Sequence, residues 1–134
     1  MTRPKKSRKV CQPPIMKGYK PFGIPMCKIE SIQLSIEEHE SIRLVNYEML
    51  SQEEAAIKMN VSRPTLTRIY NKALKIIAKA FIEGKAILIE GGNYEFDNEW
   101  YRCQNCHNLI EGNTPKKCKK HSDCNSSELI KLNN

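Results

Sequence analysis

The stretch that decides the fold is SQEEAAIKMNVSRPTLTRIYNKALKIIAKAF, residues 51–81. Ser51 and Glu54 have the spacing of a capping box, in which the serine oxygen accepts a backbone N–H and the glutamate reaches back to the cap. We therefore expect a short helix that starts at Ser51 and runs through Met59. Asn60 is its expected terminator, because asparagine tolerates the left-handed conformation.

A second, longer helix is predicted directly after this turn. Ser62 is its cap, Pro64 falls in the first turn, where a missing N–H is harmless, and Gly84 ends it. Its apolar residues follow helical spacing; they are Leu66, Ile69, Tyr70, Ala73, Ile77, Ala80 and Phe81.

Two capped helices joined only by Met59-Asn60-Val61 have helix-turn-helix spacing. Such a pair needs small residues where the helices cross, and Ala55 and Ala56 meet that need. It also needs an apolar residue in the corner, which Val61 supplies.

The outward side of the longer helix carries the candidate DNA-binding residues. Arg63, Thr67 and Asn71 align on it at 100° per residue, beside a row of bases, and we expect no aliphatic side chain there beyond Pro64. Arginine suits guanine, asparagine suits adenine and threonine suits a hydroxyl contact or a thymine methyl. Lysines in the later turns suit phosphates. The candidate set is Arg63, Thr65, Thr67, Arg68, Asn71, Lys72 and Lys75, with Lys79 in the same row.

The flanking segments complete a predicted domain over residues 29–92. Ser35 and Glu38 form another capping box, which begins a helix that runs to about Tyr47. Residues 29–34 give a weak strand or turn signal, and Ala86–Ile89 is a strand candidate. The predicted fold class is mostly α: a three-helix helix-turn-helix bundle with an extended basic N-terminal arm and a small C-terminal zinc-ribbon-like module.

Residues 1–28 are predicted to form the arm, because proline removes a donor and blocks helix. They hold eight Lys or Arg and no acid, whereas residues 29–59 carry a charge of −5 and residues 60–90 a charge of +4, in a chain of net charge +7. This distribution indicates a polyanion met by two surfaces, although a merely solvated surface would show it too. Within the arm we expect Arg3, Lys5 and Lys6 to contact DNA, either inserted in a minor groove or as a non-specifically attracted tail.

Residues 93–134 form the predicted cysteine-rich module. Cys103 and Cys106 make a knuckle that can grip one metal ion, and Cys118, His121 and Cys124 follow. Two ligand sets suit tetrahedral zinc: the four cysteines Cys103, Cys106, Cys118 and Cys124, which we favour, or a set that takes His121 in place of Cys124. Alternatives are an iron–sulfur cluster and unligated thiols.

The other cysteines and histidines give weaker signals. Cys11 and Cys27 are interpreted as ordinary arm residues, with a second metal site as the alternative. His39 is expected to be a packing or surface residue and His107 to be exposed.

Several classes of protein are disfavoured. No apolar run approaches the roughly 20 residues of a spanning helix. The N-terminus lacks the apolar stretch of a secretory signal, so we expect a cytoplasmic protein. We find no glycine-rich phosphate loop and no nucleophile–base set, and we expect no enzymatic role.

Seven blocks in register carry a family resemblance: Arg3-Pro-Lys-Lys, Arg8-Lys-Val-Cys, Lys20-Pro-Phe-Gly-Ile-Pro, Glu38-His-Glu-Ser-Ile-Arg-Leu, Ser51-Gln-Glu-Glu-Ala-Ala, Met59-Asn-Val-Ser-Arg and Gly84-Lys-Ala. Over residues 3–94 the chain resembles the uncharacterised protein family 0251, also called domain of unknown function 134. The resemblance implies a DNA-binding protein with a helix-turn-helix like region 4 of sigma factors. Asn60 stands where such proteins usually have glycine.

The leading hypothesis is a transcription regulator that binds double-stranded DNA. A homodimer is one possible form of it. The first alternative is an interaction adaptor, in which the same helix docks on a protein such as RNA polymerase. The second is an iron–sulfur redox sensor.

Overall fold

The computed structural model describes residues 7–112, 124 and 128–133. Within these ranges the chain contains three α-helices, a π-helical turn and a short 3-10 helix. None of the helices in the described ranges combines the length and the apolar character that crossing a bilayer requires.

The predicted helices are present, and their caps explain where they begin. Helix α1 (Ile36–Ile42) continues as the π-helical turn η2 (Arg43–Tyr47), and α2 (Gln52–Met59) and α3 (Arg63–Glu83) follow. Both expected capping boxes form, at Ser35 with Glu38 and at Ser51 with Glu54. Gly84 ends α3 in the left-handed conformation, with φ of 68°.

The strands overturn the expected mostly-α class, because they build three small sheets and make this an α/β fold. In the first, β1 (Arg8–Val10) pairs in parallel with β5 (Tyr94–Phe96). In the second, β4 (Ala86–Ile89) lies between parallel β3 (Ser31–Leu34) and antiparallel β2 (Gly18–Tyr19). In the third, β6 (Trp100–Cys103) lies between β7 (Leu109–Glu111) and β8 (Leu129–Lys131), antiparallel to both.

The expectation of a mostly-α fold failed because the proline-rich N-terminal segment supplies strands. Proline blocks helix locally, but it permits short strands at the edge of a sheet. Val10 of β1 is 1% exposed and lies in the main core. Gly18 of β2 allows a close approach to β4, because a Cβ at this position would lie 1.9 Å from the Ile87 carbonyl oxygen.

Two apolar cores hold the helices. The main core joins β1, β3, α1, α3 and β4 and is built on Val10, Leu34, Ile36, Ala73 and Ile89. The second core lies where α2 crosses α3 and is built on Leu44, Ala55, Ala56, Met59 and Leu66.

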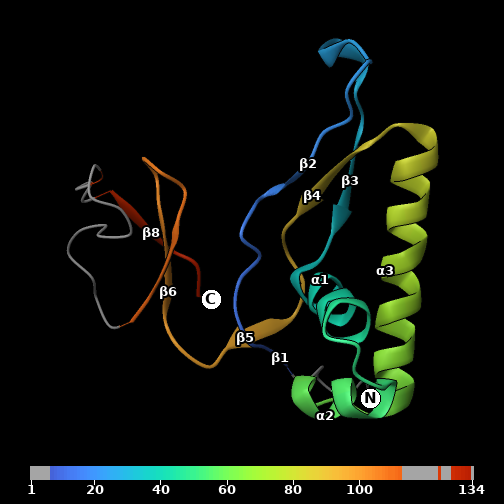
Figure 1. The fold of residues 1–134 in the computed structure, drawn as a ribbon, viewed down its shortest axis with the longest axis vertical. Helices are drawn as coiled ribbons and strands as arrows, with labels where there is room; N and C mark the ends of the chain where they lie inside the picture. Colours follow the sequence, from blue (N-terminus) through green and yellow to red (C-terminus); the bar gives the residue numbers. More distant parts are fainter. Residues whose placement is uncertain (1–6, 113–123, 125–127, 134) are drawn as a thin grey trace, which may run out of the picture.

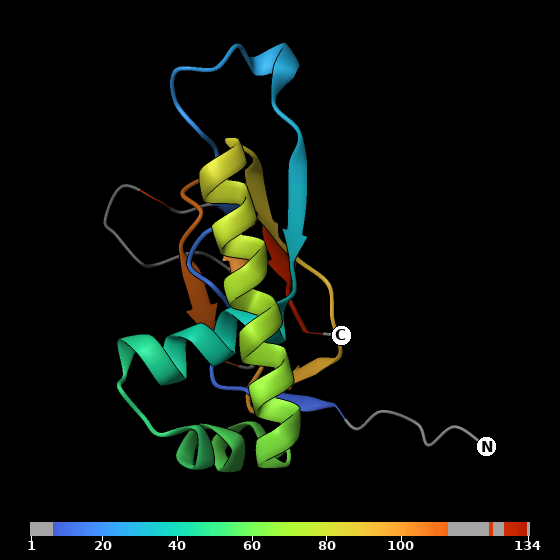
Figure 2. The same cartoon turned by 90° about the vertical axis from the view of Figure 1, so that its right-hand side faces the viewer.

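Figure 1 shows the resulting layers: α3 packs along one side of the β2–β4–β3 sheet, and the β7–β6–β8 sheet lies on the other side. Figure 2, turned by 90°, shows α2 across the N-terminal end of α3 and a loop with the short helix η1 (Met26–Lys28) beyond its C-terminal end. The outer face of α3 is therefore turned away from the β7–β6–β8 sheet.

Candidate nucleic-acid interface and metal-ligand cluster

The turn between α2 and α3 has the expected geometry. Asn60 is left-handed, with φ of 56° and ψ of 45°, and its N–H donates to the carbonyls of Ala56 and Ile57. Ser62 accepts from the Thr65 N–H and caps α3. Ala55 and Ala56 are fully buried, so α2 can approach α3 closely. The sequence therefore predicted this junction correctly.

The predicted DNA-binding residues of α3 differ in their exposure and in their contacts within the protein. Arg63, Arg68, Asn71, Lys72 and Lys75 are exposed. Arg63 lies 3.5 Å from Glu53 of α2 in an exposed ion pair. Lys72 is 73% exposed and has its Nζ 3.9 Å from Glu38 of α1. Such exposed pairs are weak, so phosphates can displace them.

The two threonines are engaged within the protein. Thr67 donates its hydroxyl to the Gln52 amide oxygen on α2. Thr65 accepts a hydrogen bond of 2.8 Å from the Ser62 hydroxyl and another of 3.2 Å from the Arg68 guanidinium. These contacts fix the first turns of α3 and hold Arg68 against the helix.

One expectation about α3 is wrong. The helical spacing of apolar residues extends as far as Phe81, yet Phe81 is 82% exposed, and neighbouring Ile82 is 77% exposed. Leu74 is 41% exposed, on the side that was expected to lack aliphatic residues. The reason is that the sheet and α1 cover only one side of α3, so its other apolar residues face solvent.

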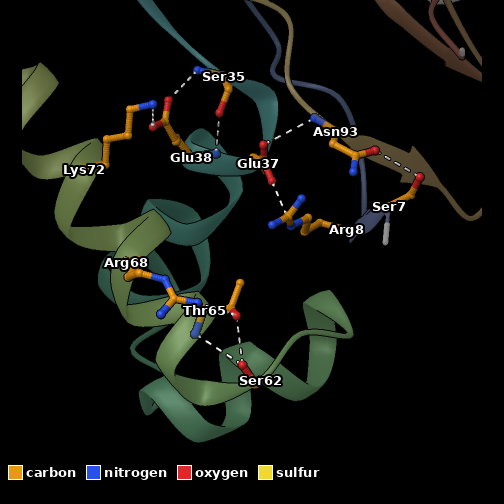
Figure 3. A network of polar contacts seen from close by, with 10 residues as sticks. All are labelled: Ser7, Arg8, Ser35, Glu37, Glu38, Ser62, Thr65, Arg68, Lys72 and Asn93. Atoms are coloured by element: carbon orange, nitrogen blue, oxygen red, sulfur yellow. Dashed lines mark hydrogen bonds and ion pairs between the residues drawn. The ribbon is translucent and has the colours of Figure 1, made fainter. Parts of the chain in front are cut away.

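A groove of about 860 Å³ runs beside α3, between this helix and the β1–α1 side of the fold. Figure 3 shows Arg68 and Lys72 facing Glu37, Glu38 and Arg8 across it. Arg8 Nε lies 3.2 Å from the Glu37 carboxylate, which also accepts the Asn93 N–H at 3.2 Å. Arg8 therefore belongs to the folded wall of the groove.

Ser7 and Arg8, at the start of the first described segment, contact other parts of the fold. Ser7 donates its hydroxyl to the Asn93 side chain at 3.2 Å, and Arg8 lines a small hollow with the turn residues Asn60, Val61 and Ser62. The predicted DNA contacts Arg3, Lys5 and Lys6 lie outside the described residues.

A buried ion pair that sequence reasoning missed holds β1 against α1. The Glu40 carboxylate is 2% exposed and binds the guanidinium of Arg43 through two hydrogen bonds. It also accepts the Cys11 N–H at 2.9 Å. The Glu40 carboxylate raises the pKa of Arg43. The i,i+3 spacing of Glu40 and Arg43 was the available signal, but the Cys11 contact had none.

His39, on α1 beside Glu40, is half-buried. Burial lowers the pKa of its imidazole, although the neighbouring Glu40 opposes the shift and Arg43 adds to it.

Three of the predicted metal ligands come together, and they could hold a metal ion. Cys103, Cys106 and Cys124 have sulfur atoms that all lie within 4.8 Å of one another, and those of Cys103 and Cys124 are 3.6 Å apart. Backbone N–H groups of Cys106 and Asn105 lower the pKa of the Cys103 thiol. Cys118 and His121 lie outside the described residues, so the fourth ligand stays a prediction.

Cys11, Cys27 and His107 are exposed. Cys11 and Cys27 belong to no cluster of potential ligands in the described part of the chain. His107 lies beyond the knuckle in the left-handed region, with φ of 64°.

Arg102, on β6, connects the β7–β6–β8 sheet to the N-terminal segment. Its guanidinium is 7% exposed and donates to the carbonyls of Pro14, Ile15 and His107 at 2.8 to 3.1 Å. Desolvation lowers the pKa of this arginine. The ligand Cys103 is the next residue, so the metal-ligand cluster and the N-terminal segment meet at Arg102.

Comparison with known proteins identifies the family. The model of a family described as "Protein of unknown function DUF134" matches residues 1–97. The chain belongs to this family. The resemblance inferred from the sequence blocks is thereby confirmed, whereas the likeness to sigma-factor region 4 stays a prediction.

Relatives in this family match along most of their length. The UPF0251 protein of Halothermothrix orenii is 48% identical over 111 residues, which cover 83% of this chain and 82% of that protein. The UPF0251 protein of Clostridium tetani is 42% identical over 130 residues, 97% of this chain and 88% of that protein. The UPF0251 protein of Chloroherpeton thalassium is 36% identical over 129 residues, 96% and 85% of the two chains. No solved structure matches the chain.

Proposed function

We propose that this protein binds double-stranded DNA sequence-specifically and regulates transcription in the cytoplasm, with the N-terminal half of α3 in the major groove. The carrying observation is that Arg63, Arg68, Asn71 and Lys72 are exposed on a helix whose first turn is capped and crossed by α2. A recognition helix presents its N-terminal residues to base edges while the preceding helix crosses the backbone.

The contacts that the α3 residues make within the protein indicate which of them suit base contacts and which suit positioning of the helix. Arg68 and Asn71 are exposed and suit hydrogen bonds to guanine and adenine edges. Thr65 and Thr67 are held by Ser62 and Gln52, so they suit positioning of the helix more than independent base contacts. Lys72 and Lys75 suit phosphates, which set the register of the protein on the duplex.

The N-terminal segment supports the same interface. Arg8 borders the hollow beside Ser62 and Thr65, at the first turn of α3. Residues that precede Ser7 in the chain therefore start next to the proposed DNA face. Arg3, Lys5 and Lys6 would add phosphate or minor-groove contacts there and steepen the salt dependence.

Fluorescence anisotropy with a labelled random duplex, over a series of salt concentrations, tests the proposal. Affinity should fall steeply with salt, and Lys72→Ala should weaken binding to all sequences and reduce the slope of log K against log [salt] by about 1. The matched control is Lys17→Ala, which removes an exposed lysine just before β2, outside α3 and outside the groove beside it.

Specificity is tested by selecting bound sequences from a random pool. Arg68→Ala should relax preference at one base position by about 1–3 kcal/mol. Weak binding that is insensitive to salt, or an effect of Lys17→Ala equal to that of Lys72→Ala, would instead favour the interaction-adaptor alternative.

We further propose that the cysteine cluster holds one structural zinc ion, with Cys118 as the fourth ligand and His121 as the alternative. With Zn–S bonds of about 2.3 Å, a tetrahedral site separates its sulfur atoms by about 3.8 Å. The 3.6 Å between Cys103 and Cys124 fits that spacing. An iron–sulfur cluster divides its cysteines among two or more iron atoms, with at most two of them on one iron of a two-iron cluster. Three cysteine sulfur atoms within 4.8 Å of one another therefore suit a single metal ion better.

Elemental analysis of anaerobically purified protein tests this assignment. We expect one zinc per chain, retained in His121→Ala and lost in Cys118→Ser. Visible absorbance together with bound iron would overturn it and favour the iron–sulfur sensor. The reverse behaviour of the two variants would make His121 the ligand.

A further inference from the structure

The C-terminal half of α3 presents an apolar stripe to solvent. Leu74, Phe81 and Ile82 are 41%, 82% and 77% exposed, and Ala78 between them is exposed too. At 100° per residue these four side chains fall within about 100° of one another. They form one face of the helix, and we call them the α3 stripe.

The α3 stripe has apolar neighbours at the same end of the molecule. The loop with η1 extends beyond the C-terminal end of α3 in both views, and Ile24 of this loop lies against Gly84 (Figures 1 and 2). Phe22 and Met26 in the loop are 100% and 67% exposed.

The exposed apolar area is larger than is usual for a surface that contacts only solvent. Buried aromatic side chains cover 150–250 Å², so Phe22 and Phe81 alone offer roughly 350 Å². Leu74, Ile82, Met26 and Ala78, all exposed, add further apolar area to these two. A standard interface uses about 800 Å² per partner, whereas apolar patches on single-chain proteins rarely exceed a few hundred.

The spacing of the stripe is symmetric, which favours a second copy of the chain as the occupant. Leu74 and Ile82 each lie four residues from Ala78, with one large apolar side chain on either side of a small one. A two-fold axis through Ala78 places Leu74 of one copy opposite Ile82 of the other. Ala78 lets the two helices approach closely, and the interface becomes self-complementary.

We propose that the protein forms a homodimer in which the C-terminal halves of two α3 helices pack antiparallel about Ala78. The dimer does not depend on DNA binding. The stripe begins at Leu74, whereas Arg63, Arg68 and Asn71 lie in the preceding turns of α3, so the contact about Ala78 is displaced along the helix from the proposed base contacts. The two recognition surfaces then lie at opposite ends of the pair.

Sedimentation velocity of the full chain without DNA, at increasing concentration, tests the proposal. The wild type should sediment as a dimer from the micromolar range upward. Ile82→Asp and Leu74→Asp should each weaken dimerisation about 30-fold or more, since each places a carboxylate at the centre of the contact. Both side chains face solvent in the single chain, so circular dichroism should show unchanged helix content.

Ile57→Asp is the matched control, because Ile57 on α2 is 78% exposed, much as Ile82 is, and lies outside the stripe. It should leave the dimer intact. A wild type that stays monomeric, or a dimer broken equally by Ile57→Asp, would overturn the proposal. Sensitivity to Leu74→Asp but not to Ile82→Asp would overturn the two-fold arrangement. In all these cases the anisotropy experiment still reports on DNA binding separately.

Discussion

Removal of the Glu40 carboxylate should destabilise the protein severely. In Glu40→Ala the Cys11 N–H loses its acceptor and Arg43 loses two hydrogen bonds. Breaking a buried ion pair from one side typically costs 3–5 kcal/mol. Arg43 is 19% exposed and keeps Glu48, at 2.9 Å, so the lower end applies. We expect a loss of about 3 kcal/mol, which for a chain of this size lowers the melting temperature by roughly 10 °C.

Urea denaturation followed by circular dichroism measures this loss, and Glu48→Ala is the control. Glu48 binds the same guanidinium but is 37% exposed, so its removal should cost less than about 1 kcal/mol. Arg43 stays ionised with or without Glu40, so the difference between the two variants should persist across neutral pH. Equal losses in the two variants would refute the reasoning that burial makes Glu40 decisive.

Four further predictions concern the turn, the pH response, the anchor and the metal. Asn60→Ala should cost about 1 kcal/mol in urea denaturation, because alanine is strained in the left-handed conformation, whereas Asn60→Gly should not destabilise. Burial lowers the pKa of His39, so its folded state binds a proton less readily than its unfolded state. Stability should therefore be full above pH 6.5 and fall as pH drops below that value, and His39→Gln should flatten this part of a melting-temperature profile. Arg102→Ala should cost about 2–3 kcal/mol, since it removes the donor of a buried hydrogen bond to the Pro14 carbonyl and of two partly buried ones to Ile15 and His107; a loss below about 0.5 kcal/mol would contradict its role as an anchor. Chelation should abolish protection from hydrogen exchange in β6–β8 and spare the helices, and a collapse of helical circular dichroism would show that the metal-ligand cluster supports the whole fold.

The helices were predictable because their signals are local. A capping box needs two residues three positions apart, and the sequence around Ser35 and Ser51 contains both. The turn at Asn60 depends on one residue and its own backbone preference. Such features do not depend on distant parts of the chain, so sequence reasoning placed α2 and α3 within a residue or two.

The sheets were not predictable in the same way. Strand β1 has three residues and pairs with β5, whose Phe96 lies opposite Val10. No periodicity develops over so short a stretch, and the pairing depends on distant residues. The proline signals of the same segment dominated and indicated an unpaired arm.

The candidate sites were predictable in part. The sequence predicted Cys103, Cys106 and Cys124 as ligands of one metal site, and the structure brings their sulfur atoms together. On α3, the helical spacing of apolar residues included Leu66 and Ala73, which are buried, but it also extended to Phe81, which is exposed. A helical pattern does not show how many sides of a helix the neighbours cover, so the α3 stripe became visible only in the folded chain.

The pairing of β1 with β5 has a consequence for how the protein is made. Ser7 donates a hydrogen bond to Asn93, 86 residues away, and all helices of the described residues are synthesised between these two partners. During translation the helices can form from local contacts, while the basic first segment waits for residues 94–96 to leave the ribosome. We therefore expect the pairing of β1 with β5 to be a late and slow step of folding, because the two strands are far apart in the sequence. A nascent chain halted just short of Tyr94 would therefore carry a formed α3 whose neighbouring strand β1 is not yet paired.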